Sequence, residues 1–170
     1  MKTLLFAAVV TVSSLASAAD TPAATGLDRL NVFAGTWKSE SETYKTPYSE
    51  EGTVTSTLDN QCWKAGAFFI CNQSVNGTSR VLLAFVYKGG DTYDVTYVPA
   101  DGSHASNGTL LVDGGVWTYP GEQHKYGQVV YFRNVNIYAN TDSLDYREEY
   151  STDQQNWTLM AKGHETRVRN

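Results

Sequence analysis

Cysteine, proline and charged residues are scarce in this 170-residue sequence. Two cysteines and four prolines exclude a disulfide-dense or proline-rich scaffold, and fourteen glycines are too few for a collagen-like chain. Charged residues make up 18%, against about 25% in typical soluble domains. The sequence has no run of about 20 apolar residues, so we expect no membrane-spanning helix. The length predicts one domain.

The charge balance argues against one class of partner. The formal net charge is -5 and the isoelectric point is about 5.1. Proteins that bind nucleic acid neutralise phosphates with basic patches, so we expect no nucleic-acid partner. Aromatic residues, in contrast, are abundant, with eleven tyrosines and four tryptophans among them.

The first 18 residues have the layout of a secretory signal peptide. Lys2 supplies the positive charge, residues 4–12 are almost wholly apolar, and small residues up to Ala18 form a cleavage site. The alternative is a buried N-terminal helix. We therefore expect export to the periplasm or the medium, a short leader over residues 19–26, and one folded domain over residues 27–170.

Both cysteines lie close together, at positions 62 and 71. If Gly66 and Ala67 form a two-residue hairpin turn, Cys62 faces Cys71 in a non-hydrogen-bonded pair. The Cα atoms of such a pair lie about 4.5 Å apart, which is within the range of a disulfide. In an exported protein this predicts a Cys62–Cys71 disulfide. A redox-active pair is the alternative, but the Cys-x-x-Cys spacing is missing.

Apolar and polar residues alternate with a period of two, which indicates strands. Residues 53–58, 93–97 and 144–150 show the pattern, and the one helical candidate is the segment from Gly26 to Ala34. Turn signals recur every ~10–15 residues, a spacing that suits antiparallel hairpins and leaves no room for crossover helices. These turn signals are Gly89–Asp91, Ala100–Gly102, Asn107–Gly108, Asp113–Gly115 and Asn140–Asp142.

Consecutive antiparallel strands must hide the edges of their sheet. Closure into a barrel does so completely, whereas a sandwich, the alternative, needs a long Greek-key connection that the sequence does not show. The predicted fold is therefore all-β: a single antiparallel up-and-down β-barrel of eight to ten strands, with a short N-terminal helical turn.

The segment from Leu27 to Trp37, which ends in Gly-Thr-Trp, resembles the start of lipocalin-like (calycin) proteins. In those proteins a short helical turn leads into a first strand that carries Gly-x-Trp. The rest of the domain is similar to uncharacterised bacterial secreted or cytoplasmic lipocalin-like domains. This resemblance rests on Val81–Tyr87, Asp91-x-Tyr93, the residues from Tyr97 to Gly102, and Thr166-Arg167.

The resemblance implies a structural pair at the closed end of the barrel. In this family the tryptophan of the first strand packs against a late arginine, which makes Arg167 the expected partner of Trp37 and Arg169 the second candidate. The resemblance also implies a cavity for one ligand in the barrel.

Tyrosines within the strand segments, beside many Ser, Thr and Asn residues, give this cavity a predicted character. A tyrosine offers an apolar ring with a polar tip, so we expect a small amphipathic or aromatic ligand rather than a fatty acid. The predicted ligand-binding residues are Tyr87, Tyr97, Tyr131 and Tyr146. Tyrosine also packs well on either face of a strand, and a shift of register by one residue reverses every assignment.

The three histidines, at positions 104, 124 and 164, lack the spacing of a zinc site, so we predict no metal and no cofactor. Some distant lipocalin-like barrels hold haem through a late histidine. That resemblance makes a haem site at His164 an alternative to a surface strand histidine.

No catalytic residue is predicted. Nucleophile and phosphate-loop motifs are missing. Asp145, Arg147 and Glu149 share one strand face, while Glu148 lies on the other face with Tyr146; a solvated outer face is the simpler interpretation than paired buried carboxylates. The sequence therefore predicts an exported barrel that binds a small molecule. A filled barrel that acts as a structural or interaction module, and a barrel-type lyase or isomerase, stay open.

Overall fold

The computed structural model describes residues 26–169, so the expected signal peptide and nearly all of the leader lie outside the described residues. One short 3-10 helix precedes ten strands in this part of the chain. The elements are η1 (Gly26–Phe33), β1 (Gly35–Thr43), β2 (Gly52–Ala65), β3 (Phe68–Val75), β4 (Thr78–Gly89), β5 (Thr92–Pro99), β6 (Ser106–Asp113), β7 (Val116–Lys125), β8 (Gln128–Asn140), β9 (Ser143–Ser151) and β10 (Thr158–Arg167).

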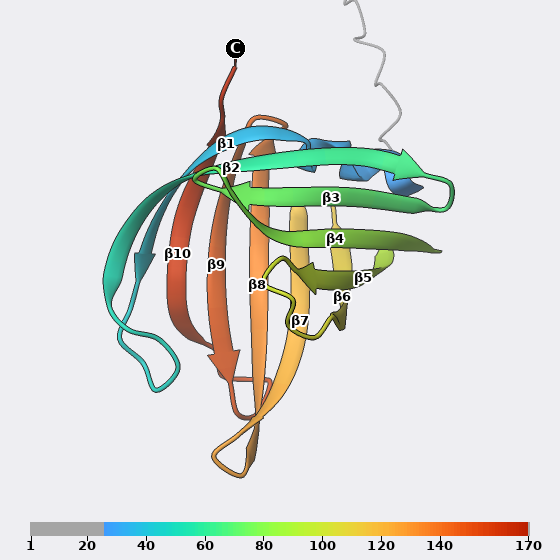
Figure 1. The fold of residues 1–170 in the computed structure, drawn as a ribbon. Helices are drawn as coiled ribbons and strands as arrows, with labels where there is room; N and C mark the ends of the chain where they lie inside the picture. Colours follow the sequence, from blue (N-terminus) through green and yellow to red (C-terminus); the bar gives the residue numbers. More distant parts are fainter. Residues whose placement is uncertain (1–25, 170) are drawn as a thin grey trace, which may run out of the picture.

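The ten strands form one closed barrel (Figure 1). Each strand pairs antiparallel with its neighbours in the chain, and β1 closes the ring by pairing with β10. This is the predicted up-and-down barrel, and it excludes the sandwich. Closure leaves no unpaired sheet edge, which is the physical advantage of this architecture.

Local sequence explains most hairpin turns. Gly66 begins the turn between β2 and β3 with φ of 62°, and Asn76-Gly77 turns β3 into β4 with φ of 51° and 77°. Both positions of a type I′ turn need positive φ, which Asn and Gly tolerate best. One expectation is wrong: Asn107-Gly108 lies inside β6 and not in a turn, because both residues pair with β5.

The β2–β3 hairpin carries the predicted disulfide. Ala65 pairs with Phe68 next to the turn, and Cys62 pairs with Cys71. The two cysteines form a disulfide, with their Cα atoms 4.1 Å apart. The hairpin parity read from the sequence is therefore confirmed, and Cys71 belongs to the buried core.

Helix η1 covers one end of the barrel, which we call the closed end. Leu30 is fully buried there, and the ring of Phe33 stacks on Phe85 and meets Trp117 edge-on, at centroid distances of 5.5 Å and 5.1 Å. The core cluster fills the barrel beneath η1 and draws on β3 to β7. Its buried members are Leu30, Phe69, Cys71, Phe85, Tyr93, Val95, Leu110, Val112 and Trp117.

Arg167 ties the closed end together. Its guanidinium carbon lies 4.3 Å from the ring centre of Trp37, which is 2% exposed. The same guanidinium donates hydrogen bonds to the carbonyl of Val32 in η1, to that of Ala34 just after η1, and to that of Thr141 in the β8–β9 turn. One side chain from the last strand thus holds the helix, the first strand and a hairpin turn in place.

Gly35 is the position that this arrangement constrains most. Its φ is 110°, and a Cβ atom there would lie 2.7 Å from Nη1 of Arg167. Side chains other than glycine adopt such a backbone conformation only with strain. The hydrogen bonds of Arg167 to fixed carbonyls leave its guanidinium little freedom to move away.

We expect Gly35→Ala to destabilise the protein by about 2–3 kcal/mol, since backbone strain and displacement of Arg167 add together. Urea unfolding followed by circular dichroism measures the change. Gly52→Ala is the matched control, because a Cβ at Gly52 meets nothing within 4 Å, and its effect should stay within about 0.5 kcal/mol. Equal effects of the two substitutions would contradict the assignment.

Candidate functional site

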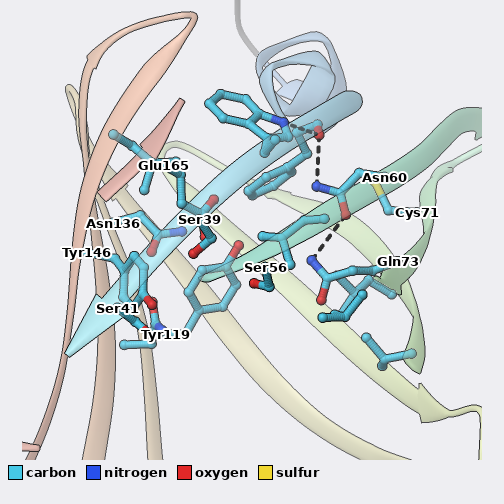
Figure 2. A pocket seen from close by; sticks show the side chains of 18 of the residues that line it. Ser39, Ser41, Ser56, Asn60, Cys71, Gln73, Tyr119, Asn136, Tyr146 and Glu165 are labelled. Carbon is cyan, nitrogen blue, oxygen red and sulfur yellow. Dashed lines mark hydrogen bonds between the residues drawn. The ribbon is translucent and has the colours of Figure 1, made fainter. Parts of the chain in front are cut away.

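A cavity of about 500 Å³ lies inside the barrel beside the core cluster (Figure 2). Its size is within the range of small-molecule sites, and its lining is of three kinds. The apolar side chains are Phe33, Trp37, Leu58, Cys71, Val75, Val81, Leu83 and Leu144. The tyrosines are Tyr97, Tyr119, Tyr138 and Tyr146. The polar side chains are Ser39, Ser41, Ser56, Asn60, Gln73, Asn134, Asn136, Glu148 and Glu165.

A short hydrogen-bond network fixes the end of the cavity next to η1. The carbonyl of Phe33 accepts hydrogen bonds from Nε1 of Trp37 at 3.3 Å and from Nδ2 of Asn60 at 3.1 Å. Gln73 in turn donates to Oδ1 of Asn60 at 3.1 Å, and Figure 2 shows these bonds as dashed lines. Polar groups at this depth therefore have partners, which buried groups need.

Glu165 on β10 contributes a carboxyl group to the cavity wall formed by β1 and β10. It pairs across the sheet with Ser39 on β1 and with Leu144 on β9. Burial raises the pKa of the Glu165 carboxyl, while a hydrogen bond with Ser39 and the more distant His164 lower it by less. The site thus holds an acid whose neutral form is favoured relative to an exposed glutamate.

Tyrosine hydroxyls form a second polar feature of the interior. Burial raises the pKa of Tyr119 well above its usual value, and repulsion from Tyr138 and Tyr97 adds to the effect. Burial likewise raises the pKa of Tyr138, with a further contribution from Glu165. The hydroxyls of Tyr97, Tyr119 and Tyr138 therefore stay protonated at neutral pH and can donate hydrogen bonds to a ligand.

A glycine positions the fourth tyrosine. Gly163 on β10 pairs with Tyr146 on β9, and a Cβ at Gly163 would lie 2.5 Å from the ring of Tyr146. The ring of Tyr146 therefore lies across the bare backbone of Gly163. A glycine within a strand often marks such a close approach.

A hollow in the barrel wall, which we call the second opening, lies next to the cavity. β6 and β7 pair through only three residues at their shared hairpin, Leu111 to Asp113 with Val116 to Thr118. Beyond them the strands separate, and a hollow lies between Gly108 on β6 and Tyr119 on β7. Four residues line both this hollow and the cavity: Tyr97, Tyr119, Asn134 and Glu148.

The four tyrosines predicted as ligand-binding residues divide into two pairs. Tyr97 and Tyr146 line the cavity. Tyr87 lies outside it at the closed end, where its ring contacts Tyr93 at a centroid distance of 5.3 Å and its hydroxyl donates to the carbonyl of Gly90. Tyr131 is also outside, because β8 turns its even-numbered side chains, such as Asn134, into the cavity.

Sequence reasoning did not single out Glu165, and a signal for it was present. Side chains two apart on a strand share a face. Since Arg167 was expected to meet Trp37 inside the closed end, Glu165 had to face inward too. For Tyr119, Asn60 and Gln73 no comparable anchor existed, because their faces depend on the register of strands in the middle of the barrel.

His164 lies on the outer face of β10. Its Nδ1 is 2.7 Å from Oδ1 of Asp145, and its side chain is 52% exposed. The haem alternative requires His164 to face the cavity. Because the side chain of His164 faces outward, the structure does not support that alternative. His104 and His124 are exposed, and no group of three or more potential metal ligands occurs within residues 26–169.

The side chains of the charged strand β9 lie on the two faces that the alternation of its sequence predicts. Glu148 and Tyr146 face the cavity, while Asp145, Arg147 and Glu149 face outward. The outer face is less solvated than expected: Glu149 is only 13% exposed because it pairs with Arg133. Trp157 covers this pair, with its ring centre 3.9 Å from the guanidinium carbon of Arg133.

The fold and the site together define a closed ten-stranded antiparallel barrel with an internal, partly polar cavity. No helix among residues 26–169 has the length and apolar character needed to cross a membrane. Solved structures with a similar barrel include two of low sequence identity. Rv2717c from M. tuberculosis superposes with a TM-score of 0.53 at 16% identity, over 88% of this chain and 99% of that chain.

The second is a protein of unknown function from the DUF3598 family of Nostoc punctiforme. It gives a TM-score of 0.54 at 16% identity, over 82% of this chain and 49% of that chain. No protein-family model and no curated protein matches the sequence. At such low identity the two structures show the barrel fold alone.

Glu165 makes stability depend on pH in a defined direction. Because its pKa is higher in the folded protein, the folded state holds the proton more tightly than the unfolded chain. The stabilisation from the neutral form is complete below the ordinary glutamate pKa of about 4.3 and is lost as pH rises through the folded pKa. We expect Glu165→Gln, which stays neutral, to gain stability relative to the natural protein between acid and neutral pH.

Urea unfolding at several pH values measures this difference. Glu40→Gln is the control with the opposite sign, since the hydrogen bond from Lys38 lowers the pKa of that exposed carboxyl. Its relative stability should fall slightly over the same range. A Glu165→Gln difference that does not change with pH would show that the carboxyl is not held in a desolvated site.

Proposed function

We propose that this protein is an exported barrel of the lipocalin-like class that binds a small amphipathic or aromatic molecule in its cavity. The observation that carries the proposal is the cavity of about 500 Å³, whose wall combines apolar side chains, tyrosine rings and amide or hydroxyl groups. A largely apolar pocket with a few converging polar groups is the usual form of a small-molecule site.

The distribution of the core supports this over a filled structural module. Beneath η1 the barrel is filled by the cluster around Phe85 and Trp117. On the opposite side, β1, β2 and β8 to β10 present short polar residues such as Ser39, Ser41 and Asn136, which leave space between the walls. A barrel selected only for stability would gain by filling that space, because cavities in the interior destabilise a fold.

Filling the cavity tests the proposal. N-phenyl-1-naphthylamine, a neutral aromatic probe whose fluorescence rises in apolar surroundings, should bind the natural protein. Val81→Trp places an indole into the cavity. It should weaken binding of the probe about ten-fold or more, because the probe and the indole then compete for the same space.

Leu82→Trp is the matched control. Leu82 is the next residue of β4 and pairs on the outer face with Val98, which is 41% exposed. This variant should bind the probe within about two-fold of the natural protein. Unchanged binding by a folded Val81→Trp variant, or the same loss in both variants, would contradict a site in the cavity.

Export is supported by the layout of the first 18 residues and by the Cys62–Cys71 disulfide, because disulfides persist in oxidising compartments. Native mass spectrometry of the protein from its own host tests export and binding together. We expect the mass of a chain that begins at Ala19, with both thiols oxidised, and a non-covalent adduct of defined mass. Residues 1–18 retained in the mature protein, or two free thiols, would count against export.

A second candidate function has one observation in its favour. A carboxyl with a raised pKa in a cavity is a feature of general acids and bases, so Glu165 is compatible with a lyase or isomerase. The other cavity carboxylate is Glu148 on β9. It lies four residues from Leu144, the β9 partner of Glu165, which corresponds to about 13 Å along the strand. Because this backbone spacing exceeds that of residues paired on neighbouring strands, we rank binding first.

A further inference from the structure

The charges that line the cavity are of one sign. Glu148 and Glu165 contribute carboxyl groups, whereas no lysine, arginine or histidine among the described residues belongs to the lining. A site for a fatty acid or another organic anion would be expected to present the reverse, because a buried anion needs a basic or hydrogen-bond-donating partner.

Neither carboxylate has an ion-pair partner among residues 26–169. Within the part of the chain that the structure describes, no basic side chain forms an ion pair with Glu148 or Glu165. Glu148 accepts one long hydrogen bond from Asn134, at 3.5 Å, and Glu165 has the hydroxyl of Ser39. Every outer-face carboxylate of β9, in contrast, contacts a cationic group or a histidine.

Three basic groups near the cavity have other partners. Arg167 is held by backbone carbonyls behind Trp37. Arg133, at the second opening, pairs with Glu149. Lys125 lies six residues along β7 from Tyr119, about 20 Å by strand rise, over the rings of Tyr48 and Phe132. None of them is placed to compensate the charge of a carboxylate in the cavity.

The two carboxyl groups occupy different depths. Glu165 lies in the row of paired residues that contains Ser39 and Leu144, next to the closed end. Glu148 lies four residues beyond Leu144 on β9, and it also lines the second opening. Tyr146 lies on β9 between the levels of the two carboxyl groups, and Figure 2 shows its ring on the same wall as Glu165.

Tyrosine rings give the interior a second preference for cations. The face of an aromatic ring attracts a positive charge, and aromatic cages are a recurring device for organic ammonium groups. Four tyrosines line this cavity, and each is partly buried, which strengthens the attraction relative to that of an exposed ring. A metal ion fits less well, because no group of three or more potential metal ligands occurs within residues 26–169.

We propose that the cavity selects organic cations, namely a protonated amine or quaternary ammonium on an apolar or aromatic body. The charged group lies against Glu165 at the inner end, the body lies among the tyrosines, and Glu148 attracts the cation at the opening. This inference rests on the proposed function, because it names the chemical class of the ligand for the same cavity.

Three probes of one shape separate charge from size. They are 1-naphthylmethylamine, which is a cation at neutral pH, 1-naphthylmethanol, which is neutral, and 1-naphthoate, which is an anion. Isothermal titration calorimetry of the mature protein at pH 7 and low salt measures each dissociation constant. We expect the amine to bind about ten- to a hundred-fold more tightly than the alcohol, and the anion to bind most weakly.

Single carboxyl substitutions locate the charge selectivity. Glu165→Gln should weaken binding of the amine about ten-fold and change binding of the alcohol by less than about two-fold. Glu148→Gln should have a smaller effect of the same sign, since Glu148 is exposed at the opening. Glu40→Gln, which removes the same charge from the outer face of the neighbouring strand, should change neither. Unchanged binding of the alcohol also shows that each variant is folded.

The outcomes distinguish this inference from the proposed function. If none of the three probes binds, the proposed function fails and the inference fails with it. If the alcohol or the anion binds as tightly as the amine, the binding function stands and selectivity for cations is overturned. Selectivity for the amine that survives both Glu165→Gln and Glu148→Gln would likewise overturn the assignment to these carboxyl groups.

Discussion

Closure of the barrel around the Trp37–Arg167 contact is the constraint on which the rest of the structure depends. The guanidinium lies over the indole and donates to carbonyls of η1 and of the β8–β9 turn, so segments more than 100 residues apart meet at one side chain. Gly35 permits the approach because it has no side chain. Once this end is closed, the direction of every strand and the inward face of β1 and β10 are set. Ser39 and Glu165 then have to point into the interior.

The same closure divides the interior into a filled half and a hollow half. Large side chains of β3 to β7, such as Phe85 and Trp117, pack under η1 and supply the apolar burial that stabilises the fold. The opposite wall carries short polar residues among its larger side chains, and these short residues leave the interior there unfilled. A fold with a well-packed end can tolerate the cost of a cavity elsewhere. Stability and the candidate site therefore reside in different parts of one barrel.

Glu165 shows how closely the two are connected. Glu165 precedes Arg167 by two residues on β10. The guanidinium of Arg167 is nevertheless directed toward backbone carbonyls and Asp142, and not toward the cavity. The carboxyl is therefore partly desolvated without a countercharge, which raises its pKa and lowers the stability of the unliganded protein. A group that is unfavourable for stability and accessible from a cavity is the feature on which the proposed ligand site depends.

Local patterns determined the elements of this protein. Alternation with a period of two predicted strands, closely spaced turn residues predicted an antiparallel meander, and hairpin parity around Gly66 predicted the Cys62–Cys71 disulfide. Tertiary structure decided which alternate set faces inward. Tyr97 and Tyr146 line the cavity while Tyr87 and Tyr131 do not, and Asn107-Gly108 continues a strand instead of turning. The physical reason is that a strand pattern defines two faces without naming the inner one. Only pairing around the whole ring, with its bulges and its closed end, fixes that choice.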